Sequence, residues 1–152
     1  MKLSTKGRYA MLALVDLVLN GEDRLVTLVE ISERQKISLA YLEQLFVKLR
    51  RAGILASARG PSGGYQLAKL PDKIRISEIL YAVDEGMNAL AQGAGASGAN
   101  VGSAAQILTD RLWEQLSANV YVYLHQTRLS DILFEQLTPC PAVPAFVELV
   151  DE

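Results

Sequence analysis

Polar and apolar residues follow a helical rhythm through the first part of the chain. From Ser4, a favourable N-cap residue, apolar positions recur at helical spacing as far as Asn20. Thr27 is followed three residues later by Glu30, the spacing of a capping box, and a short helical stretch runs on to about Gln35. The pattern predicts two helices here.

A third helical stretch and a hairpin follow. Residues 39–53 have Ser38 as their N-cap and Gly53 at the position after the helix end. Two short β-rich runs, "ILASAR" and "YQLAK", then flank the Gly/Pro-rich turn "GPSGG". Three helices followed by a hairpin is the order of a winged helix-turn-helix, so we expect a mostly α fold with a small β-hairpin wing.

The third helix has two distinct faces. Apolar residues at three- and four-residue steps predict a buried stripe of Leu39, Leu42, Leu45, Phe46 and Leu49. The opposite face carries Ala40, Tyr41, Gln44, Lys48 and Arg51. A recognition helix presents its N-terminal residues to the base edges of the major groove. Ser38, Tyr41 and Gln44 lie at that end, whereas Lys48, Arg50 and Arg51 lie further along, where phosphates are the expected partners.

Glu43 on the same helix has no Lys or Arg three or four residues away. An acid beside a DNA backbone weakens binding, so one interpretation is that Glu43 accepts from a cytosine amino group or penalises wrong sequences. The other interpretation, a solvated surface acid, stays equally open.

Further basic residues lie in the hairpin and at the N-terminus. Arg59 precedes the wing turn and Ser62 lies within it, where an arginine can enter a narrow minor groove; the alternative is a plain hairpin with one surface arginine. Lys2, Ser4, Lys6 and Arg8 flank the start of the first helix, where its dipole favours a phosphate.

The second half predicts helices of a different kind. "ISEILYAV" starts a capped helix at Ser77, and a long amphipathic helix follows from about Ala104 to Gln126. Its apolar stripe comprises Leu108, Leu112, Leu116, Val120, Tyr123 and Leu124. One small domain cannot cover so long a stripe, so we expect a second copy of the chain to cover it. Trp113 and the tyrosines are expected in the core, and "TRLSDILFEQL" predicts a last short helix.

These elements suggest three segments. We expect a winged helix-turn-helix domain over residues 1–76 and a Pro-broken tail over residues 138–152. Between them, residues 77–137 hold a linker helix, a Gly/Ala-rich loop (91–106) and the dimerisation helix.

Charge divides the chain in the same way. Residues 1–76 carry a balance of +6 and residues 77–152 a balance of −8, which the net charge of −2 conceals. A basic segment joined to an acidic one favours a polyanion-binding module, with chance unevenness as the alternative. No apolar run is long enough to span a bilayer, and the single cysteine, Cys140, suits a reducing compartment, so we expect a cytoplasmic protein with no membrane partner. We expect Cys140 to be an ordinary thiol rather than a redox sensor, and His125 to be a surface residue or a partner of the helix dipole.

"LSTKGRYA", "ISERQKISLAYLEQLFVKLRRAGILASARGPSGGY" and "AVDE" together resemble the IscR family of dimeric winged-helix regulators. The resemblance is strong over residues 1–85 and continues more loosely through "LTDRLWEQL". It implies that Ser38, Ala40, Tyr41, Glu43 and Gln44 form the base-reading surface and that Arg59 enters the minor groove. It also implies dimerisation through the long helix, and regulation of iron–sulfur biogenesis or stress genes.

Members of this family that hold a [2Fe–2S] cluster use three cysteines and a histidine just before the long helix. The resemblance places these positions at Ala91, Ala99, Ile107 and Asp110. Engineering would explain the alanines but not Ile107 or Asp110, so we favour a natural homologue. Because a cluster needs thiolate or imidazole donors, we expect no cofactor held in the family manner and no metal site.

Three functions remain to be compared. The favoured one is a sequence-specific regulator, a repressor that acts as a homodimer on a pseudo-palindromic site in double-stranded DNA. The alternative is a protein-interaction module, controlled by a partner metabolic enzyme or a small ligand, with the acidic half as docking surface. An enzyme is disfavoured, because the sequence contains no recognisable nucleophile–base pair, and "RGPSGG" lacks the Lys-Ser/Thr of a phosphate-binding loop.

Overall fold

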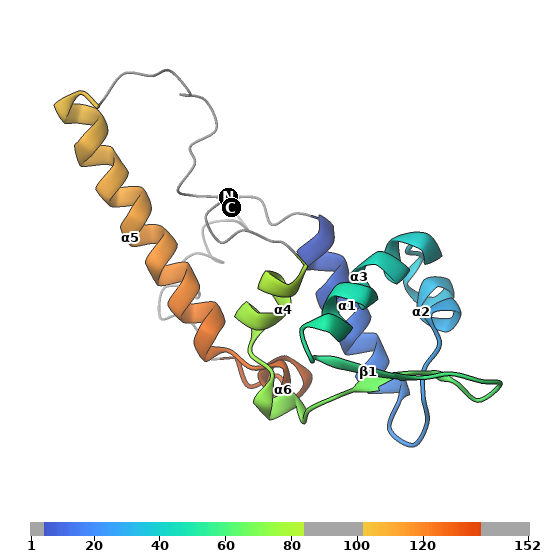
Figure 1. The fold of residues 1–152 in the computed structure, drawn as a ribbon. Helices are drawn as coiled ribbons and strands as arrows, with labels where there is room; N and C mark the ends of the chain where they lie inside the picture. The colour runs from blue at the N-terminus through green and yellow to red at the C-terminus, as the bar shows by residue number, and fades with distance from the viewer. Residues whose placement is uncertain (1–4, 84–101, 138–152) are drawn as a thin grey trace, which may run out of the picture.

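The computed structural model describes residues 5–83 and 102–137. The first part contains α1 (Thr5–Asn20), α2 (Leu28–Gln35), α3 (Leu39–Arg51), β1 (Leu55–Ala58), β2 (Gly64–Leu67), the 3-10 helix η1 (Pro71–Lys73) and α4 (Ile76–Ala82). The second part contains α5 (Ala104–Gln126) and α6 (Leu129–Leu133). Figure 1 shows α1–α4 and the hairpin gathered into one body, with α5 lying along its side and projecting beyond it. The predicted mostly helical fold with a β-hairpin wing is confirmed.

One apolar core joins the helices to the base of the hairpin. Its fully buried side chains come from α1, α2, α3, the start of the hairpin, α4 and α6, and include Leu14, Ile31, Phe46, Ile54, Ile79 and Leu129. Four of the five apolar residues predicted on the third helix, Leu42, Leu45, Phe46 and Leu49, are buried. Leu39 is 38% exposed, contrary to the prediction. It is the first residue of α3, and helical side chains tilt toward the N-terminus, so it extends beyond the turn that would cover it.

The predicted helix ends are mostly confirmed. Thr27 caps α2: its Oγ1 accepts from the Glu30 backbone N–H, while the Glu30 carboxylate accepts from the Thr27 backbone N–H at 2.8 Å. Gly53 follows the end of α3 with φ of +75°, the left-handed conformation that favours glycine. The proposed cap Ser4 lies outside the described residues.

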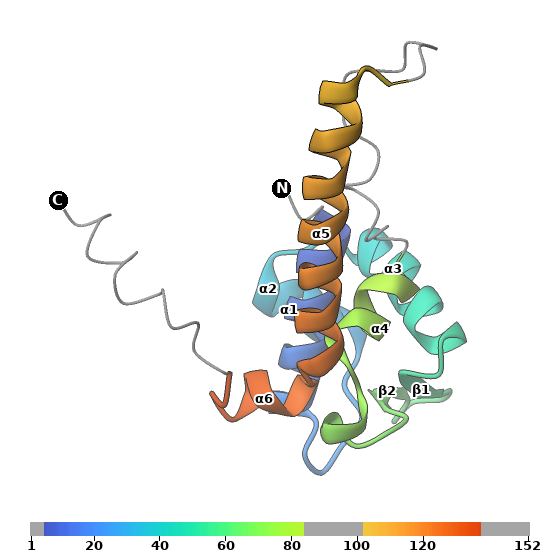
Figure 2. The same cartoon turned by 90° about the vertical axis from the view of Figure 1, so that its left-hand side faces the viewer.

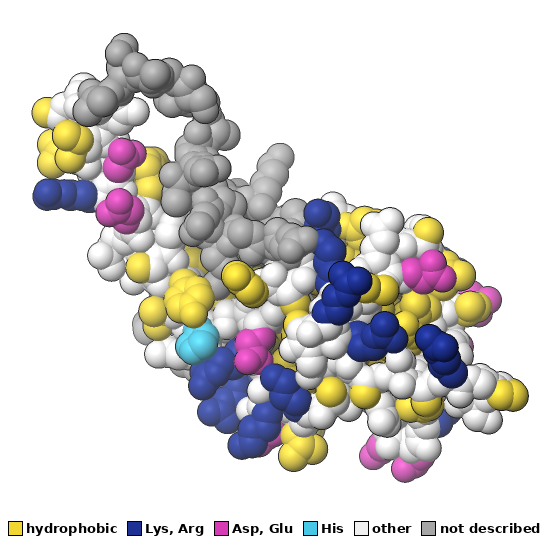
Figure 3. Space-filling view, viewed as in Figure 1, with side chains coloured by type: hydrophobic (Ala, Val, Ile, Leu, Met, Phe, Trp, Pro, Cys, Tyr) yellow, Lys and Arg dark blue, Asp and Glu magenta, His cyan; other side chains and the backbone are white. Residues whose placement is uncertain are grey.

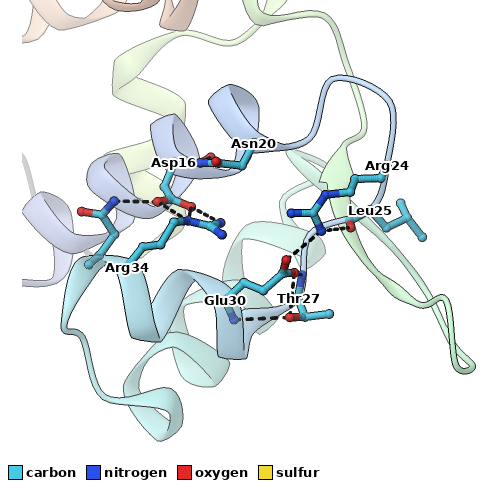
Figure 4. Close-up of polar contacts among 8 residues, drawn as sticks. Asp16, Asn20, Arg24, Leu25, Thr27, Glu30 and Arg34 are labelled. Atoms are coloured by element: carbon cyan, nitrogen blue, oxygen red, sulfur yellow. Dashed lines mark hydrogen bonds and ion pairs between the residues drawn. The ribbon is translucent and has the colours of Figure 1, made fainter.

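An ion pair between a buried aspartate and a partly exposed arginine fastens α1 to α2. Asp16 on α1 is buried, and the Arg34 guanidinium on α2 donates to both of its carboxylate oxygens, with the shortest distance 2.7 Å (Figure 4). Gln35 Nε2 donates to the same carboxylate at 2.6 Å. Burial alone would raise the pKa of Asp16, but the hydrogen bonds from Arg34 and Gln35 outweigh it and hold that pKa below its ordinary value.

The hairpin is held to the body by a third, very short strand segment. β1 and β2 are antiparallel, with Leu55 opposite Leu67 and Ala58 opposite Gly64. Val26 exchanges two backbone hydrogen bonds with Tyr65, at 2.8 and 3.0 Å, and the Phe46 ring packs edge-on against the Tyr65 ring. The loop before α2 and the core side of α3 therefore fix the base of the wing.

The second half differs from the expectations in three respects. α4 starts at Ile76 with Arg75 in the N-cap position, because Arg75 N–H donates to Glu78; Ser77 lies inside the first turn and is buried. The predicted long helix is confirmed as α5, so residues 104–106, which the division into segments also counted in the loop, belong to the helix; its N-cap Ser103 accepts from the Gln106 backbone N–H. Trp113, expected in the core, is exposed in the single chain, as are Tyr81, Tyr121 and Tyr123. The division into segments at residue 76 stays a prediction.

Candidate DNA-binding interface

The turn between α2 and α3 sets the direction of the candidate recognition helix. Lys36 ends α2 in the left-handed conformation, with φ of +56°. Ser32 on α2 then donates its hydroxyl to the Ile37 carbonyl at 2.6 Å, and Ser38 Oγ accepts from the Tyr41 backbone N–H at 3.4 Å. Because these bonds close the turn locally, α3 leaves it at a defined angle to α2, as a helix-turn-helix requires.

The N-terminal end of α3 presents a small polar surface. Ser38, Ala40, Glu43 and Gln44 are exposed, as the sequence predicts. Tyr41 is half-buried instead, and its ring meets the Tyr9 ring of α1 edge-on at 5.7 Å. Sequence reasoning missed Tyr9, because no local spacing pairs a residue on α1 with one on α3. Tyr41 is thus positioned by α1, whereas Gln44 extends from the helix without a described contact that would fix it.

The basic end of α3 is tied to the wing. Arg50 Nη1 donates to Ser57 Oγ of β1 at 3.2 Å, and both residues are exposed. Arg51 is exposed and Lys48 half-buried. Arg50 can therefore offer its other N–H groups to a phosphate while it fixes the wing relative to the helix. Ser57 was also missed, because a lone serine in a strand gives no signal of such a bond.

Other candidate residues surround this helix. Lys6 and Arg8 are exposed in the first turns of α1, and Arg59 and Ser62 are exposed at the wing. Figure 3 shows a row of Lys and Arg side chains that runs over α1 and α3 toward the wing. This row gives one face of the winged-helix body a positive potential suited to a polyanion. Lys2 and Ser4 lie outside the described residues.

The wing turn needs a glycine at position 63. A Cβ there would lie 2.5 Å from the Ala58 carbonyl oxygen and 2.9 Å from that of Gly60, both of them backbone atoms. We expect Gly63→Ala to lower the free energy of unfolding by about 1–3 kcal/mol, the usual cost of an overpacked site. Chemical denaturation checks this, with the exposed neighbour Ser62→Ala as control. Equal stabilities of the two variants would contradict the tight turn.

Two of the four residues aligned with cluster ligands lie in the described part of the chain, and neither is a cysteine or a histidine. Ile107 and Asp110 are exposed in the first turns of α5, and Ala91 and Ala99 lie outside the described residues. Among residues 5–83 and 102–137, no three His, Cys, Asp or Glu side chains converge. The single His125 is about four turns from Asp110 on the same helix, and the chain has one cysteine. Three thiolates and an imidazole cannot therefore be supplied in the family manner.

The apolar stripe of α5 has no partner within the described chain. No residue of α5 is buried, and Leu108 and Leu112 are 65% and 58% exposed. Leu116 and Tyr123 are also exposed, and Val120 is half-buried. Leu124, half-buried in the last turn, differs because it packs against the core of the body.

A family model described as an iron-dependent transcriptional regulator, Rrf2, matches residues 3–135. The chain belongs to the Rrf2 family. It is 64% identical to the HTH-type transcriptional regulator IscR of Cereibacter sphaeroides, over all of this chain and 99% of that protein. It is 44% identical to IscR of Aliivibrio salmonicida over 89% of this chain and 79% of that protein.

Solved structures of Rrf2 regulators have the same fold. T. potens IscR matches with a TM-score of 0.69 at 33% identity, covering 90% of this chain and 88% of that one. CymR, the global cysteine regulator of B. subtilis, matches with a TM-score of 0.71 at 30% identity, covering 89% of this chain and 98% of that one. The chain is thus a winged-helix, DNA-binding transcriptional regulator of the IscR type and not an enzyme, as the sequence predicts. None of the described helices has the length and apolar character of a membrane span.

Proposed function

We propose that this Rrf2 regulator acts as a homodimer that represses transcription by occupying a two-part, pseudo-palindromic promoter site. The observation that carries the proposal is the long exposed apolar stripe of α5 beside a body with an exposed polar recognition helix. A second copy covers such a stripe with two-fold symmetry, and the two α3 helices then read two half-sites separated by whole turns of DNA.

The experiment combines a mass measurement with site selection. The molar mass of the purified chain is measured by light scattering, and duplexes are selected from a random library by binding to it. We expect twice the chain mass and an inverted repeat among the selected sequences. A monomer, or selected sites without two-fold symmetry, would contradict the proposal and would favour a different protein as the occupant of α5.

Within each half-site we assign base reading to the N-terminal end of α3. Gln44 is exposed there, and an amide side chain can bond adenine through both of its polar atoms. Ser38, Ala40 and Glu43 flank it, and Tyr41 is braced by Tyr9. Lys6, Arg8, Lys48, Arg50 and Arg51 are assigned to phosphates, and Arg59 with Ser62 to the groove next to the wing.

Gln44→Ala and Arg51→Ala are expected to affect DNA binding in different ways. Gln44→Ala should lose about 1–3 kcal/mol of discrimination at one base pair of each half-site. Arg51 is also exposed on the same helix, and Arg51→Ala should weaken binding to all sequences alike and reduce the salt slope by about one for each phosphate that it no longer neutralises. Titration of a panel of single-base-pair variants of the selected site at two salt concentrations distinguishes them. A uniform loss in Gln44→Ala would refute its role in base reading.

A further inference from the structure

The long helix meets the winged-helix body at its C-terminal end. α5 packs against α4, and Leu124 in its last turn is the residue of α5 that packs against the core. Figures 1 and 2 show the opposite end of α5 projecting past the body. A helix of 23 residues is about 34 Å long, so a small change of angle at its base moves its far end by a large distance.

Three residues form polar contacts at this base, which we name the α4–α5 joint: Arg75, Ser77 and His125. His125 Nδ1 and Ser77 Oγ lie 3.1 Å apart, and Arg75 Nη1 donates to the His125 carbonyl oxygen. Ser77 is buried in the first turn of α4. The His125 ring also stacks on Tyr121, with centroids 5.4 Å apart and an interplanar angle of 17°.

Backbone hydrogen bonds lock the chain just beyond the joint. Ile76 N–H donates to the Thr127 carbonyl at 3.0 Å, and Leu129 N–H donates to the Ile74 carbonyl at 2.9 Å. Leu129 is fully buried in the core. These bonds hold the chain just after the end of α5. The Ser77–His125 contact instead reaches a residue inside the last turn of α5, so it restrains the helix itself.

We propose that the α4–α5 joint sets the angle between the dimerisation helix and the DNA-binding body, and thereby the operator half-site spacing that the dimer accepts. The inference rests on the proposed homodimer. If α5 pairs with its copy, the distance between the two recognition helices depends on this angle in both protomers. Relative to one body, a rotation of about 10° over about 34 Å moves the far end of α5, and the copy paired with it, by about 6 Å. This displacement exceeds the rise of about 3.4 Å between base pairs. A joint that allowed such a rotation would therefore let the dimer bind operators with several different half-site spacings.

The chemistry of the contact suits a structural role. A serine hydroxyl can donate to a neutral imidazole nitrogen or accept from a protonated one, so the bond persists with either form of the ring. Of the charged groups around it, Arg75 bonds the His125 backbone, and Glu78 accepts from the Arg75 N–H and pairs with Lys69 at 3.6 Å. Ser77 and His125 are positioning residues, since neither belongs to the candidate base-reading surface on α3.

The first test measures tolerance to spacing. The full-length wild type selects an operator, and duplexes are then made with spacers one and two base pairs longer and shorter. Ser77→Ala and His125→Phe should reduce the preference for the best spacer about fivefold, the factor that corresponds to one hydrogen bond, with binding to an isolated half-site unchanged. His125→Asn, which keeps a polar atom near the place of Nδ1, should restore the preference. Ser130→Ala on α6 serves as control.

The second test needs no operator. A spin label at Glu22→Cys, in a chain whose own thiol is removed by Cys140→Ser, reports the distance between the two bodies of a dimer. The inference predicts one narrow distance distribution, broadened by Ser77→Ala and by His125→Phe. A narrow distribution that neither substitution broadens, or an unchanged spacing preference, would overturn the role of the joint. If no distance between two spin labels can be detected, the chain does not dimerise, and the proposed homodimer itself would be wrong.

Discussion

Replacing Arg34 by methionine is expected to lower the free energy of unfolding by about 3–5 kcal/mol, because it leaves a buried carboxylate without its cation. The Asp16 side chain is 2% exposed, and Arg34 supplies three of its four hydrogen bonds from other side chains. Gln35 alone cannot neutralise the charge. Methionine keeps the apolar stem of Arg34, so the loss reports on the guanidinium. Urea denaturation at neutral pH measures it.

The chain contains a matched control for burial. Arg24 pairs with Glu30 at 2.7 Å, the same distance as in the Arg34–Asp16 pair, but these side chains are 53% and 30% exposed. Arg24→Met is expected to cost no more than about 1 kcal/mol, because water solvates the remaining carboxylate. If Arg34→Met and Arg24→Met lowered the free energy of unfolding equally, burial of the carboxylate would not explain the contribution of the α1–α2 ion pair to stability.

The wild type and Arg34→Met should also respond differently to acid. In the wild type the pKa of Asp16 is lowered, so its contribution to stability is complete above the unfolded pKa and is lost as the pH falls through the folded one. The pKa of Glu30 is also lowered, to about 2, by hydrogen bonds from the Thr27 backbone N–H, Arg24 and the Thr27 hydroxyl. Its contribution to stability is therefore lost as the pH falls from the ordinary pKa of 4.5 to about 2. In Arg34→Met, burial raises the pKa of Asp16, and protonation then relieves the buried charge. The deficit of the variant should therefore shrink as the pH falls, and a constant deficit would contradict this account.

Local chemistry explains which parts of the fold could be predicted. The capping box of α2 depends on residues three apart, and Gly53 follows α3 in the left-handed conformation that glycine adopts more readily than other residues. The Asp16–Arg34 pair joins residues eighteen positions apart, and no local rule selects that arginine among the others. Ser77 was predicted as a cap from local sequence alone, but it lies inside α4. The Ile74–Ile76 segment is bonded to residues 127–129, and this long-range pairing places the start of the helix earlier.

In the candidate site, too, local sequence predicts some features and tertiary packing decides others. Ala40 and Gln44 are exposed, as predicted from the helical periodicity that separates them from the buried stripe. Tyr41 has the same periodicity but is half-buried, because Tyr9 of α1 approaches the start of α3. The Arg50–Ser57 bond likewise depends on how the wing folds back over α3. Periodicity thus predicts the face on which a residue lies, while tertiary packing decides whether its side chain remains available to DNA.

Leu112→Glu is expected to convert the protein into a folded monomer and to weaken operator binding by a factor of about 10²–10⁴. Leu112 is 58% exposed in the single chain, so a charge there is solvated and the winged-helix body keeps its stability. In the proposed dimer the same side chain is buried against a second copy, where an unpaired carboxylate is costly. The two bodies then no longer bind the half-sites as one molecule, and the gain from their linkage is lost.

Ala118→Glu is the matched control for this charge. Ala118 is exposed on the same helix and lies about 120° around its axis from Leu112, away from the apolar stripe. Sedimentation measures the mass of each variant, fluorescence anisotropy measures operator affinity, and the denaturation midpoint reports folding. A dimeric Leu112→Glu would contradict the proposed interface, as would a monomeric Ala118→Glu. Affinity lost without any change of mass would place residue 112 in contact with DNA instead. The expected pattern, a stable monomer that retains weak half-site binding, follows only if α5 holds the two bodies together.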